Sequence, residues 1–154
     1  MQGEWPQHYL EYIMRTLAAY GRIGATKLLT FPSFGSMLAG AFSSPQTIRI
    51  REPGTILGIY GDTLNATAPA FAGLQCRVQI GGTEYLWTDG QSPTYVSLLS
   101  LVGGAQNWFP LLRRAIPGVD WVADFVNNSA LTDTPSLKLA FIADADVGRQ
   151  MKQQ

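Results

Sequence analysis

Charged residues are scarce in this chain of 154 residues, at 14%, against roughly 25% in ordinary soluble domains. Lysines and arginines number 11 and acidic residues number 11, so the formal net charge is zero. A neutral chain creates no field that attracts nucleic acid or an anionic membrane, so we expect it to bind neither. A lone molecule with so few charges must cover itself with small polar and apolar groups, which favours contact with other chains.

Histidine and cysteine occur only once each, which removes residues that most enzyme and metal sites need. A triad of nucleophile, histidine and acid would have to use His8, and no nucleophile-elbow stretch of the Gly-x-Ser-x-Gly type is present. One histidine and one cysteine cannot complete a closed zinc site. Cys76 lies in an alternating run, which favours a buried strand residue over a reactive thiol. We therefore expect no enzyme activity, no cofactor and no metal.

Long apolar runs are absent too. The most apolar early run, residues 28–42, is interrupted by Pro32 and Gly35 and is too short for a membrane span. The chain does not open with the basic, apolar and small-residue regions of a secretory signal. The sequence therefore predicts a protein made in the cytoplasm, with no membrane partner.

The spacing of the few acidic residues argues against a catalytic pair. Asp120 and Asp124 lie on one face of an alternating run, about 13 Å apart if that run is a strand. A glycosidase holds its two carboxylates roughly 5 to 10 Å apart, so each residue would need a partner from another strand. Solvated strand faces explain both. A carboxylate-dependent glycosidase stays an alternative only if two acids face each other across a cleft.

Asp144 and Asp146 form an Asp-Ala-Asp sequence that could supply oxygen ligands to calcium, with Asp133 from a nearby loop. A calcium loop concentrates more acids and a glycine within about a dozen residues. A polar strand end is the simpler interpretation.

A helical period is clear only near the N-terminus. Residues 6–20 place large apolar side chains at spacings of three and four, with Pro6 at a first-turn position and Gly21 as a stop. This pattern predicts an amphipathic helical arm. We expect its apolar stripe to form an interface with a partner chain through four residues: Leu10, Ile13, Met14 and Leu17.

Residues 24–45 are rich in Gly, Ala, Ser and Phe and show neither the helical nor the strand period cleanly. We interpret them as an extended connector with at most one short helix or strand. The sequence thus divides into a helix and extended arm over residues 1–45 and a β domain over residues 46–154.

After Pro45 the period changes to two. Residues 47–52 alternate apolar with polar side chains, as do residues 74–80, and Gly81-Gly82 then predicts a hairpin with a two-residue turn. Residues 93–102 form a further strand or a short helix. Short strands separated by turn signals, with no helices between them, indicate a mainly β protein. The predicted fold is an antiparallel β-sandwich or jelly roll with the N-terminal α-helical arm.

The stretch from Trp108 to Ser129 fits the same architecture. It opens with an extended run whose Pro110 favours a sheet edge. Pro117-Gly118 predicts a type II turn. The residues after this turn alternate, with Trp121 on the fully apolar face, so we expect that tryptophan in the core.

Trp87 and Trp108 are the better candidates for surface aromatics in this pattern. Aromatic faces stack on sugar rings, and aromatic residues are just as common at protein interfaces. We therefore consider both as part of a surface that binds a partner or a carbohydrate.

Several turn and strand devices follow one another near the C-terminus: Phe109-Pro110-Leu111, Arg113-Arg114, Pro117-Gly118, Asn128-Ser129 and Leu137 to Phe141. In this order they resemble the closing strands of small jelly-roll accessory proteins of bacteriophage particles. The resemblance implies an oligomeric particle component, such as a head decoration or minor capsid protein, and no cofactor.

The sequence thus predicts a non-enzymatic structural protein located in the virion and made in the host cytoplasm. We expect it to associate with copies of itself, as a trimer or a larger ring, and to dock with other virion proteins on a larger shell. The alternative is a carbohydrate- or receptor-binding module of a phage tail or adhesin that uses Trp87 and Trp108.

Overall fold

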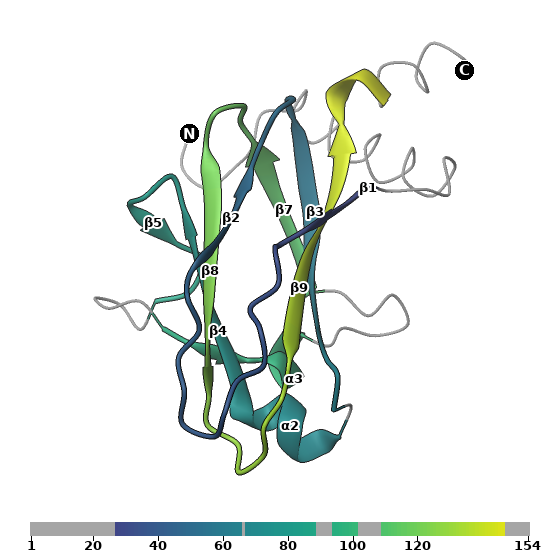
Figure 1. Ribbon diagram of the computed structural model, residues 1–154. Helices are drawn as coiled ribbons and strands as arrows, with labels where there is room; N and C mark the ends of the chain where they lie inside the picture. Colours follow the sequence, from purple (N-terminus) through teal and green to yellow (C-terminus); the bar gives the residue numbers. More distant parts are fainter. Residues whose placement is uncertain (1–26, 66, 89–93, 102–108, 147–154) are drawn as a thin grey trace.

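The computed structural model describes residues 27–65, 67–88, 94–101 and 109–146, which form two facing β-sheets with short helices at one end (Figure 1). The elements are β1 (Lys27–Thr30), β2 (Gln46–Arg49), β3 (Gly54–Thr63), α2 (Ala68–Gly73), β4 (Leu74–Ile80), β5 (Glu84–Tyr85), β6 (Val96–Ser97), α3 (Leu98–Leu101), β7 (Phe109–Ala115), β8 (Asp120–Asn127) and β9 (Pro135–Ala143).

Both sheets are antiparallel. The four-stranded sheet has the order β1-β9-β3-β7, and the five-stranded sheet has the order β2-β8-β4-β5 with β6 also paired to β4. The pairing is nested along the chain, because β1 pairs with β9, β2 with β8, β3 with β7 and β4 with β5. The predicted mainly β fold, a sandwich of two antiparallel sheets, is confirmed.

The core lies between the sheets and follows the alternation of the sequence. Trp121, Ala123 and Phe125 of β8 are buried, while the residues between them face outward and stay partly exposed. Cys76 of β4 is completely buried, as predicted, and burial raises the pKa of its thiol. β9 contributes core side chains in the same way: Leu137, Leu139 and Phe141.

β7 lies at the edge of its sheet, as Pro110 predicts. Pro110 pairs in register with Gly58 of β3, next to an irregularity in that ladder. In the turn that follows β7, Gly118 has a φ of 85° and the N–H of Val119 donates to the carbonyl of Ile116 at 3.1 Å. Both features fit the predicted type II turn. The turn carries the chain from the four-stranded to the five-stranded sheet.

The hairpin between β4 and β5 has a longer turn than expected. Residues 81–83 separate Ile80 from Glu84, which pair in register, so the predicted two-residue turn is wrong by one residue. Gly81 and Gly82 have φ values of 67° and 82°. Glycine adopts this left-handed region without the clash that a Cβ would cause.

The part of the predicted connector that follows residue 26 belongs to the sandwich. β1 pairs with β9, and Phe31, Phe34 and Met37 are buried core residues. The ring of Phe34 packs edge-on against that of Phe125, with centroids 4.7 Å apart. Neither period appears in the sequence because, between β1 and β2, this segment forms isolated β-bridges at Met37 and Phe42 and no continuous strand. The core therefore begins before the expected domain boundary.

The short helices α2 and α3 lie together at one end of the sandwich (Figure 1). α2 was not expected, although Thr67 caps it by accepting the N–H of Ala70 at 3.4 Å and a proline stands in its first turn. α3 follows β6 directly, so the segment left open in the sequence holds both a strand and a helix. Within the described ranges, no helix combines the length and the apolarity that a membrane crossing requires.

Candidate functional site

The end of the sandwich that carries α2 is the candidate functional site. We call it the loop end and define it by residues 31–45, 64–73 and 127–134, which cross or turn there (Figure 1). These segments contain no lysine, arginine or glutamate, and Asp133 is their one acidic residue. Asp133 is buried. The exposed residues of these three segments are therefore uncharged.

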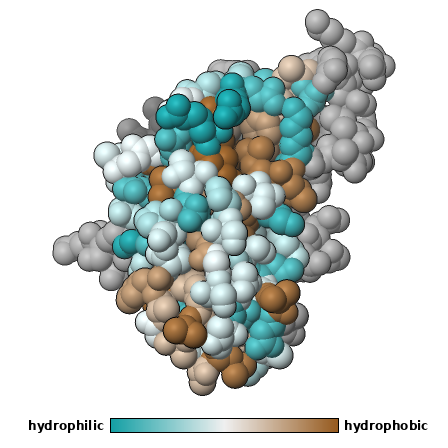
Figure 2. Space-filling view, in the orientation of Figure 1, coloured by the Kyte–Doolittle hydropathy of each residue, from teal (hydrophilic) through white to brown (hydrophobic). Residues whose placement is uncertain are grey.

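Large apolar side chains project from the loop end. Leu38, Phe42, Leu64 and Leu131 are exposed, and Leu64 keeps 83% of its surface accessible. Figure 2 shows hydrophobic residues gathered at this end, the lower one in the view. Monomeric soluble proteins rarely expose large apolar patches that bind nothing. An uncharged surface with exposed leucines and a phenylalanine has the composition of an interface core.

Asn127, the last residue of β8, holds the loops in place from a completely buried position. Its Nδ2 donates to the carbonyl oxygens of Met37 at 3.1 Å and Leu131 at 2.8 Å. Its Oδ1 accepts the N–H and the hydroxyl of Ser129 at 3.0 and 2.7 Å. Its main chain forms two more hydrogen bonds with residues 40–41. One residue thus ties two of the three loop segments together.

Asp133 ties in the remaining segment. Its Oδ1 accepts the N–H groups of Asn65 at 3.0 Å and Thr134 at 2.8 Å, and its main chain exchanges two hydrogen bonds with Met37. The other carboxylate oxygen and the buried hydroxyl of Thr63 have no hydrogen-bond partner within the described part of the chain. The loops are therefore ordered before any partner arrives, which lowers the entropic cost of association.

The aspartates considered as calcium ligands do not come together. Asp133 lies at the loop end, whereas Asp144 follows β9 at the opposite end and binds Arg114, with one contact of 2.7 Å. Among the residues that the structure describes, no three His, Cys, Asp or Glu side chains are grouped as metal ligands.

The outer face of the five-stranded sheet carries a polar cluster with aromatic walls. Arg77 donates to both carboxylate oxygens of Asp124 at 3.2 and 2.8 Å, and the Tyr95 hydroxyl donates to the same carboxylate at 3.2 Å. The guanidinium lies 4.8 Å from the ring centre of Tyr95 and 5.6 Å from that of Tyr85. The hydrogen bond with Asp124 raises the pKa of Arg77, and burial raises the pKa of Tyr95. Asp120 accepts a hydrogen bond from Arg49. Each of the two acids considered as a catalytic pair therefore forms an ion pair with its own arginine.

Of the two surface aromatics singled out in the sequence, Trp87 lies within the described residues. Trp87 is half-buried and packs against the core. Among the residues with described side chains, the exposed aromatic one is Phe42, whose ring lies 6.5 Å from that of Tyr95. The alternation of the strand could have predicted that Tyr85 lies on the outer face, but no local sequence pattern predicts that Phe42 is exposed. Several predicted interface residues lie outside the described residues: Trp108 and the arm residues Leu10, Ile13, Met14 and Leu17.

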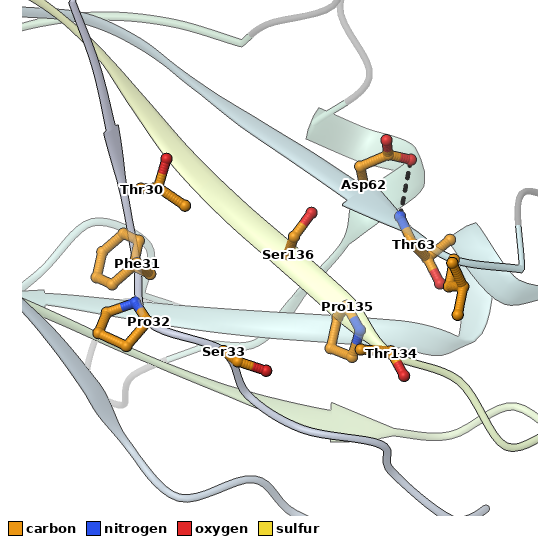
Figure 3. A pocket seen from close by; sticks show the side chains of 10 residues that line it. Thr30, Phe31, Pro32, Ser33, Asp62, Thr63, Thr134, Pro135 and Ser136 are labelled. Carbon is orange, nitrogen blue, oxygen red and sulfur yellow. Dashed lines mark hydrogen bonds between the residues drawn. The ribbon is translucent and has the colours of Figure 1, made fainter.

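A groove of about 480 Å³ crosses β9 beside the loop end (Figure 3). Asp62 is its one charged lining residue, and its carboxylate accepts the N–H of Thr63 at 2.8 Å and the hydroxyl of Tyr60 at 3.3 Å. No second acid lines the groove, so it offers hydrogen bonds but not the paired carboxylates of a glycosidase. The other polar residues of its lining carry hydroxyls: Thr30, Ser33, Thr63, Thr134 and Ser136.

No family model, curated protein or solved structure matches this chain. Function is therefore inferred from the strand pairing and the surfaces of the molecule itself.

Proposed function

We propose that the protein is a non-enzymatic structural component of a virion, with a jelly-roll body and an N-terminal helical arm. It associates with copies of itself and docks on a larger protein shell, as a head decoration or minor capsid component. The observation that carries this proposal is the loop end, an ordered and uncharged surface with large exposed apolar side chains.

The nested strand pairing supports the jelly-roll topology. A jelly roll is a long antiparallel hairpin folded over on itself, so its first strand pairs with its last and the pairs continue inward. The pairs β1–β9, β2–β8, β3–β7 and β4–β5 follow that order. The chain also changes sheet at each step from β1 to β4 and again from β6 to β9. Viral capsid domains are one of the main classes of jelly roll.

The loop end also suits a protein contact energetically. Burial of one large apolar side chain that is exposed in the monomer contributes roughly 1.5 to 3 kcal/mol. Leu64 and Phe42 are both large apolar side chains that are exposed in the monomer. No exposed ionic group of the three loop segments would have to lose its hydration, because Asp133 is already buried.

Leu64→Lys in the full-length chain tests the proposal. We expect the wild type to be a trimer or a larger ring and the variant to dissociate into monomers, because the contact would bury an unpaired charge. Size-exclusion chromatography with light scattering, over a range of protein concentrations, measures the mass of each species.

Ile116→Lys is the matched control, because Ile116 is an exposed aliphatic residue in the turn between β7 and β8, away from the loop end. This variant should assemble like the wild type. A wild type that stays monomeric at high concentration, or a Leu64→Lys variant that assembles as well as Ile116→Lys, contradicts the proposed role of the loop end.

A second candidate function is a carbohydrate- or receptor-binding module. The outer face of the five-stranded sheet favours it, because Tyr85 and Tyr95 flank Arg77 beside the exposed ring of Phe42. Aromatic rings provide flat apolar faces for sugars, and charged side chains form strong hydrogen bonds with polar groups. Binding to a glycan array that is lost in Tyr95→Ala and kept in Leu64→Lys would favour this second function.

A further inference from the structure

Asp62, near the end of β3, has a negative charge that no described basic side chain neutralises. Most acidic residues within the described ranges form an ion pair: Glu52, Glu84, Asp120, Asp124 and Asp144. Asp133 is buried and accepts main-chain N–H groups, and Asp146 has an interaction of its own. Within the described part of the chain, Asp62 accepts hydrogen bonds only from Thr63 and Tyr60, neither of which is positively charged.

Lys138 is the nearest base by strand register, yet it does not pair with Asp62. Lys138 lies opposite Tyr60 and Ser136 lies opposite Asp62, so the two charged residues are diagonal neighbours on one face of the sheet. Among the described residues, their side chains form no ion pair. An ionised carboxylate has about four lone-pair positions, and each oxygen of Asp62 accepts one hydrogen bond from the chain. The carboxylate can therefore accept further hydrogen bonds from a ligand.

The groove that Asp62 lines is continuous with the loop end. Part of its lining also belongs to the loop-end segments: Phe31, Pro32, Ser33, Leu64 and Thr134. Leu64, which is 83% exposed, belongs both to the groove and to the apolar surface of the loop end. A partner that covers Leu64 therefore reaches the groove and removes Asp62 from water.

Covering the Asp62 carboxylate is unfavourable unless the partner supplies a positive charge. A carboxylate that loses its hydration without gaining a charged partner is strongly destabilised. The loop-end segments contain no lysine or arginine that could pair with it. The base must therefore come from the partner.

An arginine fits the groove better than a lysine or a sugar does. A guanidinium has five N–H donors in one plane and binds a carboxylate through two parallel hydrogen bonds. Further acceptors are at hand, because Ser136 carries a hydroxyl beside Asp62 on the neighbouring strand β9 (Figure 3). An ammonium has three donors and is more strongly hydrated.

The apolar part of the lining also favours a side chain over a sugar. Sugars stack on open aromatic faces, but Phe31, the aromatic residue of the groove, is 3% exposed and belongs to the core. Pro32, Leu64 and Pro135 form aliphatic walls instead. The methylene stem of an arginine packs well along such walls while its charged head forms hydrogen bonds.

We propose that the groove receives an arginine side chain from the protein that docks on the loop end, and that its guanidinium pairs with the carboxylate of Asp62. This inference rests on the docking role proposed for the loop end and adds the chemistry that selects the partner. Apolar residues such as Leu64 provide contact area, whereas the unpaired charge of Asp62 rejects partners that lack a base at this position.

Two peptides that differ in charge test the pairing: acetyl-Ser-Arg-Ser amide and the same peptide with citrulline in place of arginine. Citrulline has nearly the same length and shape as arginine but is neutral. NMR titration of the isotope-labelled, full-length protein measures the dissociation constant of each peptide. We expect the arginine peptide to bind at least about fivefold more tightly, with shift changes at the amides of Thr63 and Ser136.

The titrations use Leu64→Ser as the background. This change removes the exposed apolar side chain of the proposed contact between subunits and adds no charge beside the groove. The groove is then open to a peptide whether or not the wild type assembles.

Asp62→Asn in this background should abolish the preference for arginine. Asparagine keeps an acceptor for the N–H of Thr63 but has no charge. Asp120→Asn is the matched control, because it makes the same change at an acid of the other sheet that already pairs with Arg49, and it should keep the preference. Asp62→Ser repeats the measurement if Asp62→Asn does not fold.

Equal affinity for the two peptides with Asp62 intact, or a preference that persists in Asp62→Asn, would overturn the inference. A lysine peptide that binds as tightly as the arginine peptide would show that the choice of arginine is wrong. The assembly of the wild type and of Leu64→Lys is measured separately by chromatography, so failure of the proposed function can be told from failure of this pairing.

Discussion

The loop end and the opposite end of the sandwich are held together by different chemistry. Figure 2 shows hydrophilic residues at the upper end, which we call the charged end. Exposed ion pairs gather there: Lys27 with Glu52, Arg49 with Asp120, and Arg114 with Asp144. The described residues of the loop end are held instead by the buried side chains of Asn127, which donates to main-chain carbonyl groups, and Asp133, which accepts from main-chain N–H groups.

Because of this difference, the charged end favours contact with water, whereas the loop end favours contact with another protein. Exposed ion pairs remain hydrated and add little stability. A partner that covered them would have to remove that hydration from both charges. The hydrogen bonds of Asn127 are already formed away from solvent, so a partner at the loop end would remove mainly apolar surface from water.

The largest effect that this comparison predicts is that of Asn127→Ala. The change leaves the carbonyl groups of Met37 and Leu131 and the N–H of Ser129 without their side-chain partner. We expect the free energy of unfolding to fall by about 2 to 4 kcal/mol, because buried polar groups that lose their hydrogen bonds are costly. Urea unfolding followed by tryptophan fluorescence measures this loss.

Asn128→Ala, one residue further on, is the control. Asn128 is exposed, and its side chain donates one hydrogen bond, to Gln75 at 3.1 Å. Its replacement should change the free energy of unfolding by no more than about 0.5 kcal/mol. If Asn127→Ala destabilises the protein no more than this control, the loops do not depend on Asn127 and the case for a preorganised surface is lost.

The strands with one wet face could be predicted from the sequence because their pattern is local. The alternation around Trp121 gave the core side of β8, and Cys76 followed from the same rule on β4. Pro117-Gly118 fixed the turn before β8 through the conformational preferences of those two residues alone. Each of these features depends on neighbours a few residues away.

Features that depend on distant partners could not be read in this way. Phe34 is a core residue because it meets Phe125 across the fold, in a segment without a strand or helix period. Asn127 appears in the sequence as part of a polar turn, yet its side chain bonds to Met37, 90 positions away in the chain.

The sequence predicted the chemical character of the candidate site but not its position in the fold. The low charge indicated an interface, but the three uncharged segments of the loop end lie far apart in the sequence and meet only in the fold. The one exposed aromatic residue named at that end, Phe42, lies in the segment that the sequence marked as a connector. The amino-acid composition therefore predicted an uncharged surface, and the position of that surface became clear only from the strand pairing of the structure.

Arg49→Gln at the charged end should have the smallest effect. Its guanidinium donates to Asp120 from a side chain that is 66% exposed, where water and salt screen the ion pair. We expect the urea midpoint to match that of the wild type within experimental error, at low salt and at about 0.5 M salt alike. A midpoint lowered as far as in Asn127→Ala would mean that the charged end also maintains the fold. The proposed contrast, between a loop end stabilised by buried hydrogen-bonding side chains and a charged end whose exposed ion pairs add little stability, would then be wrong.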